Sequence, residues 1–131
     1  MSFPLVYDHA PPLWFGGALP TITSFDDSAA VILPVPLDRT TSYVAGTRNG
    51  PRELILASAQ VELWDEELGI DVHPQGIHTL PEMDVSHGSM EATMARIHQT
   101  AASIMDAGKF LVTLRGEHSI TSPIVAAAAV R

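Results

Sequence analysis

The chain has no cysteine among its 131 residues, which excludes disulfide bonds and thiolate metal ligands. This absence is compatible with a reducing compartment, and we expect a cytoplasmic protein. No apolar run approaches the roughly 18 residues that a membrane-spanning helix requires. The N-terminus also lacks the basic segment followed by an apolar one that marks a secretory signal. The sequence therefore predicts neither a membrane partner nor secretion.

Basic residues are scarce in this chain. Seven Lys and Arg residues stand against 15 Asp and Glu residues, and the formal net charge is -8. Nucleic-acid binding is disfavoured, because phosphate recognition requires clustered basic side chains. An acidic surface would attract a cationic substrate, or it only aids solubility.

The composition is that of a folded protein. Hydrophobic residues make up 46% and charged residues 17% of the chain, which allows a buried core and argues against disorder. Prolines and glycines interrupt residues 1–28 so often that we expect an irregular leader there. Trp14 and Phe15 would anchor this leader to the body, or would serve as a lid or a subunit contact.

Residues 29–131 alternate between strand-like and helix-like patterns. Short apolar runs predict buried strands, while caps and apolar spacings of three and four predict helices. The expected strands are 29–35, 77–85 (weaker) and 110–114, and the expected helices are 52–63, 89–108 (with Ser89 as N-cap) and 124–131 (with Ser122 as cap). Pro34 either ends the first strand or faces no neighbouring strand. Apolar stripes are expected on two of the helices, at Leu54, Ile55, Ser58 and Val61 and at Met90, Met94, Ile97, Ala101 and Ile104.

Strands that alternate with helices predict an α/β fold with a parallel sheet. An outer strand with no neighbour would expose its hydrogen-bonding groups. We therefore expect residues 29–131 to be the leading part of a larger domain.

The strand at residues 110–114 stops at a polar turn, Arg115-Gly116-Glu117-His118-Ser119. In open parallel sheets, ligands bind outside the carboxyl ends of the strands. His118 is therefore the leading candidate for chemistry. From spacing alone, a hydrogen-bonded loop residue is the commoner role for such a histidine.

Two stretches together resemble the ureohydrolase family, and within it the agmatinase-like branch. The first is VPLDRTTSYVAGTRNGPRELILAS at residues 35–58, in which Gly-Pro-Arg opens a helix after the strand-end segment. The second is RGEHSIT at residues 115–121, which resembles the Gly-Gly-Asp/Glu-His-Ser motif of the family. The order, separation and strand contexts of the two stretches make the resemblance specific.

The resemblance implies a three-layer α/β/α fold and manganese-dependent hydrolysis of a guanidino compound, with agmatine giving putrescine and urea. It implies that His118 binds one manganese ion of a binuclear centre, whose two metals activate a hydroxide. Glu117 would orient the site through hydrogen bonds, or it only stabilises the turn. Asp38 would line the substrate site, or it stabilises its own turn. Homo-oligomers are typical of the family.

The chain departs from the family pattern in three ways. Arg115 replaces a glycine, where it would alter the turn and repel cations unless its side chain leaves through the surface. Pro34 stands where glycine is common. The family's Asp-x-His-x-Asp and Asp-x-Asp segments, which supply the other metal ligands, have no match here. We therefore expect the fragment alone to be inactive. The alternatives are a non-catalytic remnant that only binds another chain, another ureohydrolase acting on arginine or guanidinobutyrate, and a deacetylase relative of the same fold.

The remaining polar candidates have no spacing that predicts a site. Arg48 and Arg52 flank the start of the Gly-Pro helix and are expected to form structural ion pairs, or interface contacts. Surface positions are expected for four further histidines, which are His73, His78, His87 and His98.

Overall fold

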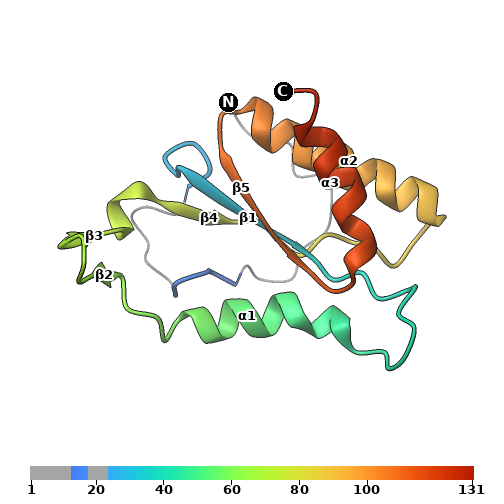
Figure 1. Cartoon of the computed structure of the whole chain (residues 1–131), viewed down its shortest axis with the longest axis horizontal. Coiled ribbons are helices and arrows are strands. Elements are labelled where there is room, and N and C mark those ends of the chain that lie inside the picture. The colour runs from blue at the N-terminus through green and yellow to red at the C-terminus, as the bar shows by residue number, and fades with distance from the viewer. Residues whose placement is uncertain (1–12, 18–23) are drawn as a thin grey trace.

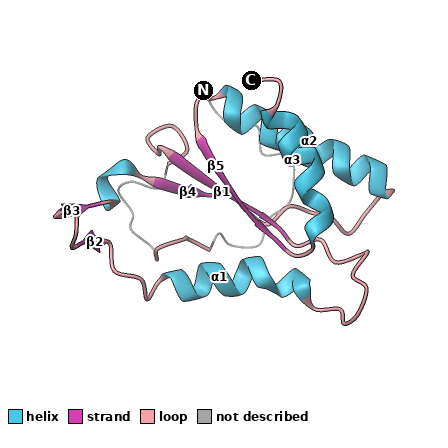
Figure 2. Ribbon diagram, in the orientation of Figure 1, coloured by secondary structure: helices cyan, strands magenta, loops and turns pink. Residues whose placement is uncertain are grey.

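The computed structural model describes residues 13–17 and 24–131, and they form a three-layer α/β/α arrangement (Figures 1 and 2). The central layer is a parallel sheet in the order β4-β1-β5. Its strands are β1 (Ala30–Val35), β4 (Ile77–Thr79) and β5 (Phe110–Arg115). Helix α1 (Gly50–Ser58) covers one face, and α2 (Met90–Asp106) and α3 (Thr121–Ala128) cover the other. The predicted fold class is confirmed.

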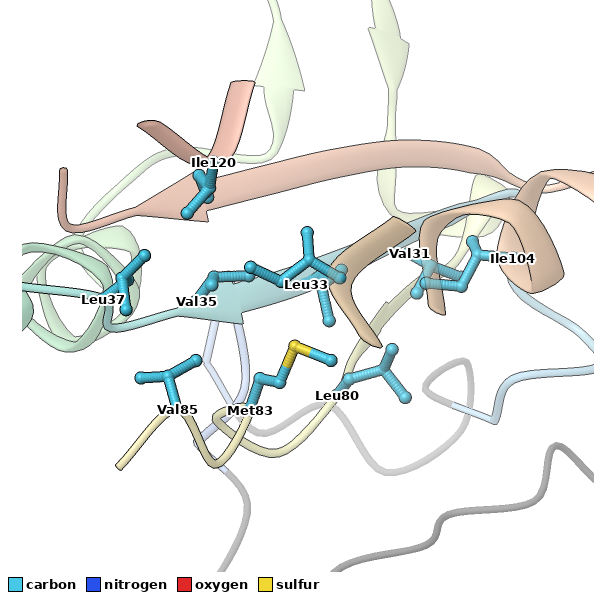
Figure 3. Close-up of a cluster of buried hydrophobic side chains, with 10 residues drawn as sticks. Val31, Leu33, Val35, Leu37, Leu80, Met83, Val85, Ile104 and Ile120 are labelled. Carbon is cyan, nitrogen blue, oxygen red and sulfur yellow. The ribbon is translucent and has the colours of Figure 1, made fainter. Parts of the chain in front are cut away.

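Strand β1 is the centre of the core, because a neighbouring strand lies on each side and a helical layer lies on each face. Val31, Leu33 and Val35 are fully buried. They pack in one cluster with side chains from the chain after β4 and from the helices, as Figure 3 shows. The partners from these elements are Leu80, Met83, Val85, Ile97, Ile104 and Ile120.

Pro34 does not end β1, which continues through Val35. The last register pair between β1 and β4 is Ile32 with Thr79. Beyond that pair, the carbonyl of Pro34 accepts a hydrogen bond from the Met83 N–H, 3.0 Å away, in the loop that follows β4. The missing proline N–H therefore faces no strand on that side, which was the second of the two expectations.

Helix α1 is shorter than expected. It begins with Pro51 in its first turn but ends at Ser58. Only Ile55 and Ser58 of its predicted stripe are buried, whereas Leu54 and Val61 are exposed. The chain leaves the helix for an antiparallel hairpin, β2 (Trp64–Asp65) and β3 (Ile70–Asp71), which the sequence reading missed.

The predictions for α2 are confirmed. The Ser89 hydroxyl accepts a hydrogen bond from the Ala92 N–H at 3.1 Å, so it caps the first turn. Ile97, Ala101 and Ile104 are fully buried, and Met90 and Met94 are partly buried against the same cluster. Gly108 adopts a φ of 73° directly after the helix, a conformation that favours glycine.

Three further expectations were wrong in their details. Strand β5 is only half-buried, and Phe110 is 72% exposed, because β1 is its one neighbour among the described residues. Ser122 does not cap α3, which instead follows a 3₁₀ turn at His118–Ile120 and ends at Ala128. Strand β4 also ends early, at Thr79 rather than residue 85. Short 3₁₀ turns occur at Thr47–Asn49 and His73–Gln75 as well.

The anchoring expected of Trp14 and Phe15 is confirmed. The Phe15 N–H donates to the Thr79 hydroxyl at 2.9 Å, and the Trp14 ring meets the His78 ring edge to face. The expected leader otherwise lies mostly outside the described residues. Within the described part of the chain, no helix has both the length and the apolar character that crossing a bilayer would take.

Candidate functional site

The candidate site lies at the carboxyl end of the parallel sheet, where the chain connections run to opposite sides of β1. From β1 the chain passes to β4 on one side and then, through α2, to β5 on the other. In open α/β sheets, such a switch point leaves a crevice at the carboxyl ends of the two strands. The two segments that leave β1 and β5 meet at this edge, and the second carries Glu117 and His118.

The turn after β5 lies directly against the segment after β1. The Gly116 N–H donates to the Val35 carbonyl at 3.0 Å, and the Glu117 N–H donates to the Leu37 carbonyl at 2.9 Å. A Cβ atom at residue 116 would lie 2.2 Å from the Leu37 carbonyl oxygen. Only glycine therefore permits this approach, which fixes the place of the two residues that follow.

Glu117 is a buried carboxylate, 6% exposed, that joins the two strand exits. One oxygen accepts hydrogen bonds from the main-chain N–H groups of Arg39 and Thr40, at 2.5 and 2.8 Å. The other accepts hydrogen bonds from the hydroxyls of Thr40 and Ser119. These donors come from both turns, so Glu117 orients the edge as well as stabilising its own turn.

The environment of Glu117 keeps it ionised. Burial raises the pKa of this carboxyl, but the hydrogen bonds from Ser119, Thr40 and Arg39 outweigh burial and lower the pKa from 4.5 to about 2. Glu117 is therefore a fixed negative charge at neutral pH, and it is not an acid that can release a proton during a reaction.

His118 opens the 3₁₀ turn between β5 and α3 and is exposed. Within residues 13–17 and 24–131, its ring makes no hydrogen bond, so both ring nitrogens are open to a ligand. The same residues contain no group of three or more histidine, cysteine, aspartate or glutamate side chains that could hold a metal ion. One imidazole does not make a metal centre, so the described residues do not fit one by themselves.

Asp38 lines the pocket beside the site, but its carboxylate is bound within its own turn. Its side chain is 2% exposed and accepts hydrogen bonds from the Gly46 N–H at 2.7 Å, the Arg48 guanidinium at 3.2 Å and the Thr41 hydroxyl at 3.1 Å. The Gly46 hydrogen bond is the main reason that the pKa of this carboxyl lies below its usual value. Stabilisation of its own turn, one of the two expectations for Asp38, is the role that the structure supports.

Arg115 does not enter the crevice. Its side chain is exposed and donates a hydrogen bond to the Thr121 hydroxyl at the start of α3. Of the two expectations for Arg115, the one in which its side chain leaves through the surface is therefore confirmed. The Arg48 ion pair with Asp38 is also confirmed, whereas Arg52 is exposed and forms no ion pair with any described residue.

Three other histidines have side chains that the structure describes, and none of them lies on the turn that carries His118. His87 is exposed and pairs with Asp84 at 3.1 Å, whereas His98 is half-buried on α2 and His78 is half-buried against Trp14 and Phe25. The expectation of surface positions therefore holds for His87 but not for His78 or His98, and the side chain of His73 lies outside the described part of the structure.

A pocket of about 520 Å³ adjoins the site on its β4 side. Apolar side chains such as Pro34, Leu37, Leu80 and Met83 line it, together with polar residues that include Arg39 and Asp84. Its volume is in the range of small-ligand sites.

Three residues of the site were missed from the sequence, namely Arg39, Thr40 and Ser119. Both Thr40 and Ser119 carry a hydroxyl group, and each stands two positions after an acid of a motif, Asp38 and Glu117 respectively. That proximity was an available signal for these two. Nothing in the sequence indicated which carboxylate they would bind.

Comparison with known proteins places these motifs in one family. The Arginase family model matches residues 28–131. The chain is 39% identical over 111 residues to the N(1)-aminopropylagmatine ureohydrolase of Synechocystis sp., covering 81% of this chain and 36% of that protein. It is 30% identical over 106 residues to the agmatinase of Bacillus anthracis, covering 81% of this chain and 37% of that protein.

A solved structure agrees. The crystal structure of the agmatine ureohydrolase of Thermoplasma volcanium superposes with a TM-score of 0.73 at 28% identity, over 80% of this chain and 36% of that chain. The chain thus spans little more than a third of the length of these relatives. With the family match extending from residue 28 to residue 131, and with the RGEHS turn at the switch point of the sheet, the chain belongs to the arginase family.

Proposed function

We propose that this chain is the N-terminal part of an enzyme that hydrolyses a guanidino compound and releases urea, with agmatine as the first substrate to test. The observation that carries this proposal is the placement of His118. The residue that matches the family's metal-binding histidine stands at the carboxyl edge, beside the switch point, on a turn that Gly116 and Glu117 hold in place. The relatives' names support a guanidino substrate, since both name a ureohydrolase or agmatinase.

The proposed cofactor is manganese, which the longer protein would bind with His118 as one ligand. Imidazole nitrogen and carboxylate oxygen are suitable donors for this ion. The further donors would have to come from outside the described residues, because these contain no sufficient group. Manganese would supply a Lewis acid and a nucleophile at neutral pH.

The substrate preference rests on charge and on the relatives. Agmatine and N(1)-aminopropylagmatine are both cations with a guanidino group, and the chain has a net charge of -8, which attracts cations. We propose agmatine before arginine because the segment at residues 35–58 resembles the agmatinase-like branch. Arginine and guanidinobutyrate remain the alternatives to include in the assay.

The decisive experiment uses the complete gene product. Urea release is measured with agmatine, N(1)-aminopropylagmatine, arginine and guanidinobutyrate, with manganese supplied and then removed by a chelator. We expect manganese-dependent turnover of agmatine that His118→Gln abolishes and His98→Gln preserves. Full activity of the His118→Gln variant would contradict the proposal.

A second candidate is a non-catalytic chain that acts only by binding another protein. The lack of a sufficient metal-binding group in the described residues is the observation that favours it. The coding sequence after the Arg131 codon separates the two candidates. An open frame that encodes Asp-x-His-x-Asp supports the enzyme, and a stop codon supports the non-catalytic chain. We expect no urea release from the 131-residue polypeptide in either case.

The complete protein is further proposed to be a cytoplasmic homo-oligomer. The absence of cysteine supports the compartment. Light scattering of the purified complete protein would test the assembly.

A further inference from the structure

Arg39 makes a set of contacts that the proposed function does not use. One guanidinium nitrogen donates to the Gly88 carbonyl at 3.0 Å, and another donates to the Val85 carbonyl at 2.5 Å. Both carbonyls belong to the loop between β4 and α2. The main-chain N–H of the same residue donates to the Glu117 carboxylate after β5. Arg39 therefore connects the exits of all three strands of the parallel sheet.

The side chain of Arg39 binds the later half of the loop between β4 and α2. The first half of this loop is tied to β1 by the Leu80 and Met83 N–H groups, which donate to the Ile32 and Pro34 carbonyls. Beyond Met83, the carbonyls of Val85 and Gly88 accept hydrogen bonds from Arg39 and that of His87 accepts one from Arg96, whereas the Ser89 carbonyl accepts from Thr93 of α2. The planar guanidinium suits the two-point contact, because it directs several donors in a fixed fork.

The contact also constrains the chain at residue 39 itself. The N–H groups of Arg39 and Thr40 are consecutive, yet both point at one carboxylate oxygen of Glu117. Such convergence requires narrowly defined backbone angles, as in other anion-binding turns. A side chain that is held at both of its terminal nitrogens restricts those angles. If it is released, the two N–H groups gain freedom to turn away from Glu117.

We propose that Arg39 is a positioning residue for His118. Its guanidinium holds the β4–α2 loop against the turn after β1, which keeps two N–H donors aimed at Glu117 and so fixes the turn that carries His118. The interest of this role rests on the proposed function, because a metal ligand or substrate contact at residue 118 requires a fixed turn. The role itself requires no bound metal.

The test compares Arg39→Gln with Arg39→Lys and with a matched control, Arg96→Gln, in the complete gene product. Arg96 also donates to a carbonyl of the same loop, that of His87 at 3.2 Å, but has no link to Glu117. Amide hydrogen exchange is measured by NMR at Gly116 and Glu117 and, as a reference for global unfolding, at Val31 and Leu33 of β1. The His118 ring signal is followed in the same samples, with the ring of His98 as its control.

We expect Arg39→Gln to speed exchange at Glu117 by about tenfold and to broaden or shift the His118 ring signal. Exchange in β1 and the His98 signal should stay as they are. Arg39→Lys should restore part of the protection, because an ammonium can reach one of the two carbonyls. Arg96→Gln should leave Glu117 and His118 unchanged.

Two results would overturn the inference. One is unchanged exchange at Glu117 in Arg39→Gln. The other is an equal increase at Glu117 and in β1, which would show a general loss of stability in place of positioning. Neither result depends on catalysis. In an active enzyme, Arg39→Gln should also lower kcat severalfold, with a smaller effect on KM. If the complete protein has no ureohydrolase activity, the proposed function is wrong, but the exchange result still decides the role of Arg39.

Discussion

Asp38 and Glu117 both follow strands at the same edge of the sheet, and both are carboxylates with low pKa values, but they bind different parts of the chain. Asp38 accepts hydrogen bonds from residues within ten positions of itself. Glu117 accepts from residues 77 and 78 positions away, as well as from Ser119. Asp38 thus shapes one loop, while Glu117 joins two. We therefore expect the loss of Glu117 to disturb the segments after both β1 and β5, and the loss of Asp38 to disturb only its own loop.

The largest effect on stability is expected at Gly116, where the turn after β5 lies closest to the segment after β1. Gly116→Ala would place a Cβ 2.2 Å from the Leu37 carbonyl oxygen, so the turn would have to move. We expect a loss of about 3 kcal/mol or more in the free energy of unfolding, measured by urea denaturation. Gly50→Ala is the control, since its Cβ would lie 3.6 Å from the Arg115 carbonyl oxygen, an ordinary contact. A wild-type midpoint for Gly116→Ala would contradict the packing described.

Glu117→Gln tests the carboxylate that joins the two exits. The amide group would lose charge and would turn a donor toward other donors, which leaves a buried polar group without a partner. The pKa of about 2 against 4.5 corresponds to about 3 kcal/mol of stability at neutral pH. Denaturation at pH 7 measures the loss, which should be accompanied by faster amide exchange in residues 38–41.

The pH dependence of unfolding in the wild type and in Glu117→Gln shows how much the ionised carboxylate of Glu117 contributes to stability. Because folding lowers the pKa of Glu117, its contribution is fully present above pH 4.5 and is lost as the pH falls toward about 2. Stability of the wild type should therefore fall more steeply in this range than stability of Glu117→Gln. Parallel curves for the two proteins would show that Glu117 does not titrate as described.

The difference between the two carboxylates also explains what the sequence could predict. The strands β1 and β5, the cap and stripe of α2 and the parallel order follow from local patterns, and so does the turn of Asp38. The bonds from Arg39 and Thr40 to Glu117 depend on the register between β1 and β5, which no local pattern encodes. Val61 was misassigned for a related reason, because the helical spacing reaches it but α1 ends at Ser58 and the chain then turns into the β2–β3 hairpin. Leu54 does lie in α1, but its side chain is exposed.

Asp38→Asn should have a smaller effect than Glu117→Gln. An asparagine oxygen can still accept one of the hydrogen bonds, but the ion pair with Arg48 is lost. Faster amide exchange should be confined to the loop at residues 38–49 and should include Gly46. If exchange also rose at Glu117 to the same degree, the two carboxylates would be parts of one network, and the distinction between local and joining acids would fail.

Ser119→Ala is the mildest change, because it removes one hydroxyl donor and leaves the main-chain donors of Arg39 and Thr40 on Glu117. We expect a loss of about 1 kcal/mol, with Ser103→Ala as the control, since the Ser103 hydroxyl donates to the Gln99 carbonyl on the surface of α2. The pKa of Glu117 should rise in Ser119→Ala but stay below 4.5, because the Ser119 hydroxyl is the first of several donors that lower it. A pKa that returned fully to 4.5 would mean that the donors after β1 contribute nothing, and Glu117 would then be a local acid like Asp38.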